Sequence, residues 1–369
     1  MQTYPNRLAF LDALKAVASQ LIVLHHLAFY GPMSDVANGL APELFEWLSQ
    51  NARIAVQVFL VIGGFLAAKG LAPSGEIATE NPLEALKKRY LKLVLPYAAA
   101  LMLSLVCAAI ARKLMVHDSI PGKPQALQLL AHLVLLQGIF HFDSLSTGVW
   151  YIAIDFQLFA LLLCILWVVH RTGFSGQKAS LFGVLLVVVT TVASLFHFNR
   201  LPSMDDWALY FFGAYGLGVL TYWITRSKHG VIWMAALTIT VLCALTISFR
   251  PRIAVALFTA LVIWIMTISG HLATFPKGRI FAFLGEISYS VFLSHFPILL
   301  ITNALVHRFW PDNPAVNGIG VLAAWLVSVG SGVIFYHLVE KRTNRLLSRG
   351  AQVIYLFGKH LPILGRQGH

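Results

Sequence analysis

Long apolar runs recur along the whole chain, and they constrain its fold more than any other feature. There are about ten runs of roughly 20 residues, the length that an α-helix needs to cross a bilayer. The residues are 58% hydrophobic and only 11% charged, whereas a soluble domain is nearer a quarter charged. We therefore expect an all-α polytopic membrane protein without a separate soluble domain of useful size.

The spans follow one another closely from the first run to the last. The first run is too long for a signal peptide and more spans follow it, so it is expected to remain in the mature protein. A further apolar stretch, 126–140, is short for a span and is expected to be a re-entrant or surface helix. The expected spans cover residues 11–30, 53–70, 91–111, 148–170, 178–197, 206–225, 231–249, 252–270, 280–306 and 317–339.

Basic residues gather in one set of connecting segments. The net charge of +12 would suggest a nucleic-acid partner in a soluble protein, but in membrane proteins Lys and Arg collect in cytoplasmic loops. Most of the 27 Lys and Arg residues fall inside if the N-terminus is cytoplasmic. We expect both termini inside, a multi-pass protein of the inner (plasma) membrane in contact with lipid, and no nucleic-acid partner. The membrane domain is expected over 1–345, with a cytoplasmic tail over 346–369.

The three cysteines carry no recognisable pattern. Cys107, Cys164 and Cys243 each lie in an apolar run. Their spacing indicates neither a disulfide framework nor a Cys/His zinc site. No metal site is expected.

The first expected helix carries polar residues on one face. His26 lies eleven positions after Lys15, which brings the two within about 20° of three full turns. Asp12, Lys15, Ser19 and His26 therefore share a face, while His25 points elsewhere. Charged residues inside a membrane usually face a bundle interior or a wet cavity, so this stripe predicts a lined cavity.

A simpler interpretation of the stripe stays open. Asp12 and Lys15 can form an i, i+3 ion pair at the inner interface, with His26 at the outer one. If the cavity interpretation holds, a neutral imidazole at its end can take a proton from a hydroxyl near pH 7. That is the chemistry that acyl transfer to an alcohol needs.

Two later spans also carry polar residues. The segment 148–159, GVWYIAIDFQLF, places Trp150 at an interface and Asp155 and Gln157 within an apolar run. A buried carboxylate needs a partner, and a histidine or lysine of the stripe is expected to supply it, unless Asp155 makes a structural hydrogen bond between helices. The segment 283–300, FLGEISYSVFLSHFPILL, holds four candidate residues of a second tier. His295 is either a second proton carrier, a ligand for substrate or a satisfied core histidine; the other three are Glu286, Tyr289 and Ser290.

Glycines and basic residues complete the candidate set. Gly63 and Gly64 in VFLVIGGFLAAK let two helices, or a helix and a ligand, approach closely. The cluster in KKRYLKLVLPY attracts anionic lipid or binds the phosphates of a cytoplasmic cofactor such as coenzyme A. Its members are Lys87, Lys88, Arg89 and Lys92.

Six segments in order resemble acyltransferase family 3 of membrane-bound O-acyltransferases. LDALKAVASQLIVLHH is similar to the first-helix motif of an arginine, ten residues and a histidine, and VFLVIGGFL resembles the SGFL segment. KKRYLKLVLPY, GVWYIAIDFQLF, LGEISYSVFLSHFP and HLVEKRTNRL resemble the next four motifs. The resemblance covers residues 7–347, essentially the whole chain.

The resemblance implies an enzyme that moves an acyl group, often acetyl, from acyl-CoA to a hydroxyl of an envelope carbohydrate or related acceptor. His26 matches the family's histidine and would be the general base. The family's arginine falls on Lys15, which keeps the charge but loses the bidentate fork. Lys15 would bind or orient the donor or hold Asp12, and Asp155, which stands for a glutamate, would orient a cavity group. Gly63 stands where the family has serine.

Two other functions remain open from the sequence. A transporter or exporter would use Asp155, His26 and His295 as a proton relay, although no inverted repeat is evident. A catalytically inactive relative would have an assembly or binding role, and the change from arginine to Lys15 is compatible with it.

Overall fold

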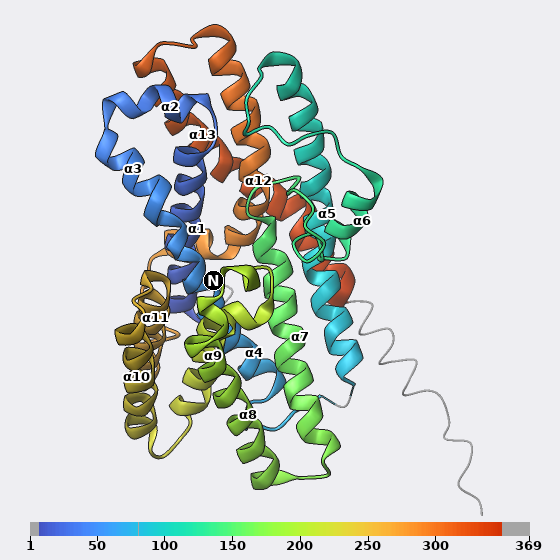
Figure 1. Cartoon of the computed structure of the whole chain (residues 1–369), viewed down its shortest axis with the longest axis vertical. Helices are drawn as coiled ribbons and strands as arrows, with labels where there is room; N and C mark the ends of the chain where they lie inside the picture. Colours follow the sequence, from blue (N-terminus) through green and yellow to red (C-terminus); the bar gives the residue numbers. More distant parts are fainter. Residues whose placement is uncertain (1–6, 80, 349–369) are drawn as a thin grey trace, which may run out of the picture.

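The computed structural model describes residues 7–79 and 81–348, and throughout this part of the chain the regular structure is helical (Figure 1). Within these residues, ten helices are long and apolar enough to cross a membrane. Each overlaps one of the ten predicted spans, so the all-α polytopic fold is confirmed. The predicted tail falls largely on residues 349–369, outside the described residues.

The helices follow the chain in the order in which Figure 1 labels them. A π-helical turn, Tyr336–Glu340, continues the last of them. The bounds are α1 Ala9–Phe29, α2 Pro32–Ala37, α3 Pro42–Asn51, α4 Val56–Leu71, α5 Pro82–Leu114, α6 Ala126–Leu133, α7 Val149–Arg171, α8 Gly176–Phe196, α9 Ala208–Thr225, α10 Gly230–Ile247, α11 Pro251–Ile268, α12 Arg279–Phe309 and α13 Pro314–Phe335.

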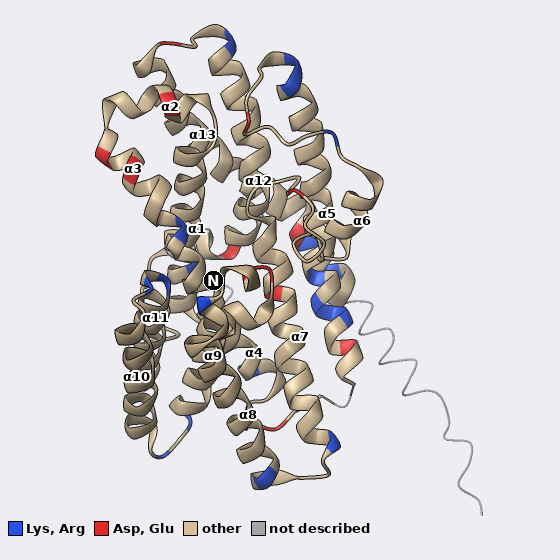
Figure 2. Ribbon diagram, in the orientation of Figure 1, with Lys and Arg blue, Asp and Glu red and all other residues tan. Residues whose placement is uncertain are grey.

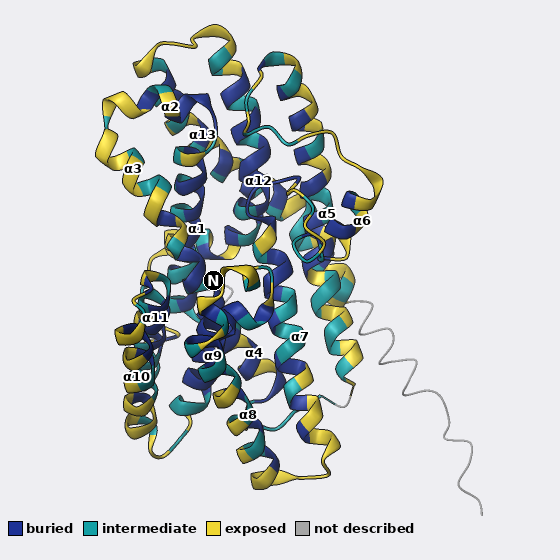
Figure 3. Cartoon of the chain, in the orientation of Figure 1, coloured by how far each residue is buried: buried dark blue, intermediate teal, exposed yellow. Residues whose placement is uncertain are grey.

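The helices form two groups that are offset along the long axis of the molecule (Figure 1). The upper group contains α1, α2, α3, α12 and α13, and α12 packs against both α1 and α13. The lower group contains α4 and α7 to α11, with α9 in contact with the other five. The long helix α5 runs beside both groups. Buried residues concentrate where the groups meet and along α9, while α10 has a largely exposed outer face (Figure 3).

Two glycines let α4 and α9 cross at close range. A Cβ on Gly64 would collide with the backbone of Tyr215, and one on Gly218 would collide with the backbone of Val61. Small residues are the usual means of bringing membrane helices together, because lipid is as apolar as a leucine surface. For Gly64, the structure therefore shows the helix-packing role.

Two helix starts differ from the prediction, while the stretch 126–140 is too short to span, as expected. The second span begins at Pro42 because α3 continues through a short turn into α4. The third begins at Pro82, where the Asn81 side chain accepts a hydrogen bond from the backbone N–H of Glu84 and caps the helix. Within the stretch 126–140, α6 has only eight residues and ends at Leu133, so this stretch does not contain a spanning helix.

Charged residues lie mainly at helix ends and in the zone between the two groups (Figure 2). The long helices of the lower group are almost free of charge along their length. The zone between the groups therefore holds the polar chemistry of the fold.

Candidate active site

His26 and His295 form a buried polar pair between α1 and α12. The Nδ1 atom of His26 lies 2.8 Å from the Nε2 atom of His295, and the two rings stack with centroids 5.0 Å apart. Their exposed fractions are only 7% and 1%. The sequence singled out both histidines, and the structure brings them into contact.

A backbone carbonyl fixes the tautomers of this pair. The Nδ1 atom of His295 lies 2.6 Å from the carbonyl oxygen of Phe292, and because a carbonyl only accepts, this nitrogen carries a hydrogen. In a neutral ring the Nε2 atom of His295 is then an acceptor, so the Nδ1–H of His26 donates to it. The Nε2 atom of His26 is left unprotonated, which is the form that a general base needs.

Gly148 places the start of α7 beside His26. Its φ of 75° lies in the left-handed region that favours glycine. A Cβ at this position would stand 3.4 Å from Cε1 of His26 and 2.9 Å from the ring of Phe292. Among the first backbone N–H groups of α7, that of Tyr151 donates to the carbonyl oxygen of Gly148 at 3.0 Å, and Gly148 brings this N-terminal turn next to the histidine pair.

His25 belongs to a different part of the molecule. Its Nδ1 atom lies 3.1 Å from the carbonyl oxygen of Leu48 on α3. The predicted divergence of the two neighbouring histidines is therefore confirmed. His26 alone faces α12 and α7.

The N-terminal end of α1 holds an ion-pair network. Lys15 Nζ lies 2.7 Å from Asp12, and Arg7 Nε lies 2.6 Å from the same carboxylate. Arg7 also donates to the carbonyl of Ala282 and lies 3.9 Å from Glu286 on α12. The i, i+3 ion pair, which was the alternative interpretation of the stripe, is thus present, with Arg7 as a second cation that sequence reasoning did not identify.

Asp155 pairs with Arg89, and the prediction that a histidine or lysine of the α1 stripe would be its partner is wrong. The two side chains are 2.5 Å apart and join α5 to α7. The reason is the early start of α5 at Pro82, which makes Arg89 part of the helix that packs against α7 instead of part of a connecting segment. Gly63 lies beside this pair, since a Cβ there would be 3.6 Å from the carboxylate of Asp155.

The basic cluster divides between two environments. Lys88 pairs with Glu84 on the same helix at 2.9 Å, and both Lys87 and Lys88 are exposed. Lys92 faces the charges between the helix groups and interacts electrostatically with Glu340. Lys87 and Lys88 lie at the surface, and Lys92, whose side chain is also exposed, is the one that lies near the charge of Glu340.

The second-tier residues of α12 bond mainly to the π-helical turn. Ser290 Oγ donates to Glu340 at 2.5 Å, and Tyr336 donates to Glu286 at 2.5 Å. Tyr289 donates its hydroxyl to a backbone carbonyl of α5 at 2.9 Å. Glu286 and Ser290 share a helix face as predicted, and they bond to the first and last residues of the π-helical turn, Tyr336 and Glu340. Glu340 is a site residue that was not singled out.

Trp150 and Gln157 have packing roles in this structure. The ring of Trp150 lies 5.6 Å from that of Phe211. The amide of Gln157 donates to the carbonyl of Asp206 at 3.3 Å and accepts from the N–H of Ala208 at 3.0 Å. Gln157 therefore ties α7 to the first turn of α9.

Across residues 7–79 and 81–348, no group of three His, Cys, Asp or Glu side chains is arranged to hold a metal ion. The site consists of the histidine pair, the N-terminal turn of α7 and the charged network below them. Such an arrangement can accept a proton at His26 Nε2 and can attract an anionic ligand through Lys15 and Lys92.

Comparison with known families gives one match. The model of the acyltransferase domain of acyltransferase family 3 matches residues 8–337. No curated protein and no solved structure matches the chain. The match runs from the first turn of α1 to the π-helical turn, so it includes every site residue named above except Arg7 and Glu340.

Proposed function

Since the chain belongs to acyltransferase family 3 and is a multi-pass membrane acyltransferase, we propose that it transfers an acyl group from acyl-CoA to a hydroxyl of an envelope carbohydrate or a related acceptor. Acetyl-CoA is the simplest donor, and the inner membrane is the proposed location. The observation that carries the proposal is the hydrogen-bond chain from Phe292 through His295 to His26.

His26 is the proposed general base. Its Nε2 atom takes the proton of the acceptor hydroxyl as the hydroxyl oxygen attacks the carbonyl carbon of the thioester. The carbon–sulfur bond then breaks, and the thiolate of coenzyme A leaves and takes the proton back from His26. Between these steps His26 is an imidazolium, and its Nδ1–H bond to His295 strengthens because the donor is charged.

The charged network at the inner end of α1 is the proposed site for the donor. Lys15 and Lys92 supply positive charge between the helix groups, and phosphate groups are anions that such residues bind. From Lys15 to His26 the helix rises roughly 16 Å. A donor held by its phosphates at Lys15 would thus present its thioester toward the histidine pair. Crosslinking that placed both the thioester and the acceptor hydroxyl on the cytoplasmic side would contradict this path.

Two adjacent histidines provide a matched test of the base. Purified protein in lipid nanodiscs would be given acetyl-CoA and an envelope glycan extract, and free thiol and glycan-bound acetate would be measured. His26→Ala should lower turnover by roughly 10²- to 10⁴-fold, while His25→Ala should leave it near the wild-type value.

The other outcomes separate the rival functions. Equal turnover in wild type and both variants would reject His26 as the base. Absence of transfer in all three, together with substrate or proton flux in sealed vesicles, would favour the transporter. Absence of both transfer and flux would favour an inactive relative.

A further inference from the structure

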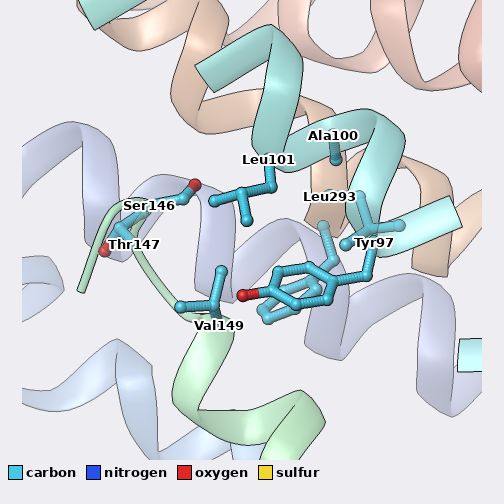
Figure 4. A pocket seen from close by; sticks show the side chains of 8 residues that line it. Tyr97, Ala100, Leu101, Ser146, Thr147, Val149 and Leu293 are labelled. Atoms are coloured by element: carbon cyan, nitrogen blue, oxygen red, sulfur yellow. The ribbon is translucent and has the colours of Figure 1, made fainter. Parts of the chain in front are cut away.

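A narrow gap lies between α5, α12 and the segment that leads into α7. Its lining is mostly apolar, with the hydroxyl groups of Tyr97, Ser146 and Thr147 at one side (Figure 4). The gap is too narrow to hold a water molecule. The remaining lining residues are Ala100, Leu101, Val149, Phe292 and Leu293.

The hydroxyl of Tyr97 has no hydrogen-bond partner among the described residues, although the side chain is only 1% exposed. Leaving such a group unsatisfied costs about 1–3 kcal/mol, and native proteins rarely tolerate it without a reason. Ser146, by contrast, is satisfied, because Ser104 donates to it at 3.0 Å. Figure 4 shows the Tyr97 oxygen directed toward Val149, the first residue of α7.

The gap adjoins the histidine pair through two residues. Gly148 separates the lining residues Thr147 and Val149, and a Cβ at this position would meet both His26 and the ring of Phe292. Phe292 lines the gap and also supplies the carbonyl that fixes His295. A buried hydroxyl donor and the N-terminal turn of a helix thus lie next to the two residues, Gly148 and Phe292, that adjoin the histidine pair.

Acyl transfer needs such donors. When the acceptor oxygen attacks, the thioester carbonyl oxygen becomes an oxyanion, and donors aimed at it in a site without water stabilise the transition state strongly. The N-terminal turn of α7 supplies backbone N–H groups and a favourable dipole. A packing defect is the simpler explanation for Tyr97, but it gives no reason for the gap to meet the helix N-terminus beside His26.

We infer that the Tyr97 hydroxyl, together with the first backbone N–H groups of α7, binds the carbonyl oxygen of the acyl donor and stabilises the oxyanion. This inference rests on the proposed acyl transfer. Tyr97 donates a hydrogen bond and keeps its proton. The oxyanion collapses back to a carbonyl as the thiolate leaves, so the step needs no further reactant. Phe292 moves aside when the donor enters, which joins the gap to the space beside His26.

Tyr97→Phe removes the hydroxyl and keeps the ring. Because the hydroxyl has no partner, the variant should fold with an unchanged or slightly raised unfolding temperature. Its kcat for transfer from acetyl-CoA should fall by roughly 10²- to 10³-fold, with little change in KM. The matched control is Tyr222→Phe. Tyr222 is a buried tyrosine of α9 whose ring packs on Phe65 of α4 within the lower helix group, and the variant should keep wild-type kcat.

The outcomes distinguish the inference from the proposed function. Wild-type kcat in Tyr97→Phe, while His26→Ala is inactive, would overturn the oxyanion role and leave the acyl transfer standing. Absence of transfer in the wild type would overturn both. A fluorinated tyrosine at position 97 keeps the side-chain shape and makes the hydroxyl more acidic. It should change kcat if the hydroxyl meets the oxyanion, and an unchanged kcat would reject the role even if Tyr97→Phe folds poorly.

Discussion

The pair His26–His295 and the pair Arg89–Asp155 both lie inside the helix bundle, but the first can be uncharged and the second cannot. His26 and His295 join α1 to α12 as two rings that can both be neutral, linked by one hydrogen bond. Arg89 and Asp155 join α5 to α7 as two charges in contact. Arginine does not lose its proton in proteins, so the second pair stays ionic wherever the fold places it.

This difference separates a pair that can react from a pair that holds helices together. A histidine pair accepts and returns a proton at ordinary pH. A buried ion pair gains little net stability from its formation, but removing one partner leaves an isolated charge and is strongly destabilising. Proton transfer thus fits the proposed role of His26 with His295 as its partner, whereas Arg89 and Asp155 join α5 to α7.

The largest expected effect comes from breaking the ion pair. Arg89→Met leaves the carboxylate of Asp155 buried without a cation, and the free energy of unfolding should fall by about 3–5 kcal/mol. Thermal or denaturant unfolding in detergent or nanodiscs measures this loss.

The control for this variant is the double substitution Arg89→Met/Asp155→Leu. Removing both charges should restore most of the lost stability, because no isolated charge remains. If Arg89→Met were as stable as the wild type, the pair would not be the joint between α5 and α7.

A smaller expected effect, on activity instead of stability, comes from His295→Phe. The variant removes the acceptor of the His26 Nδ1–H, a hydrogen bond worth roughly 1.4 kcal/mol, so kcat should fall by about tenfold or more. The pH–rate profile should also shift, since His26 loses the partner that fixes its tautomer. If His295→Phe lowered the unfolding temperature but left the pH–rate profile unchanged, His295 would have only a structural role in the core.

The smallest expected effect comes from Lys15→Met. Asp12 keeps its bond to Arg7 at 2.6 Å, and this end of α1 is only partly buried, so the free energy of unfolding should fall by about 0.2–1 kcal/mol. Unfolding curves and the KM for acetyl-CoA would be measured together. A raised KM at nearly unchanged stability would support the donor role of Lys15, and a loss of several kcal/mol would show that its main role is to hold Asp12.

Helix geometry predicted the parts of the site that lie on one helix. The 100° advance per residue separated His26 from His25, and the i, i+3 spacing predicted the contact between Asp12 and Lys15. The ten spans were equally predictable, because length and apolar character suffice to identify a membrane helix. Each of these features depends only on residues close together in the chain.

Contacts between helices could not be predicted in the same way. His26 and His295 are 269 residues apart in sequence. The sequence of neither helix determines which residues of α1 pack against which residues of α12. The wrong partner was predicted for Asp155 because Arg89 was expected to lie before the helix. The helix α5 begins earlier, at Pro82, where the Asn81 side chain caps it outside the apolar run. Tyr97 could have been singled out from the sequence as a candidate site residue, because it places a phenol hydroxyl inside the mostly apolar span 91–111.

The close crossing of α4 and α9 imposes an order on the biogenesis of the protein. Gly64 and Gly218 are separated by more than a third of the chain, so α4 enters the bilayer long before α9 has been synthesised. During that interval lipid chains cover the glycine face of α4 at little cost, because they are as apolar as leucine. The lower group therefore completes its centre only after α9 has been synthesised and displaces this lipid.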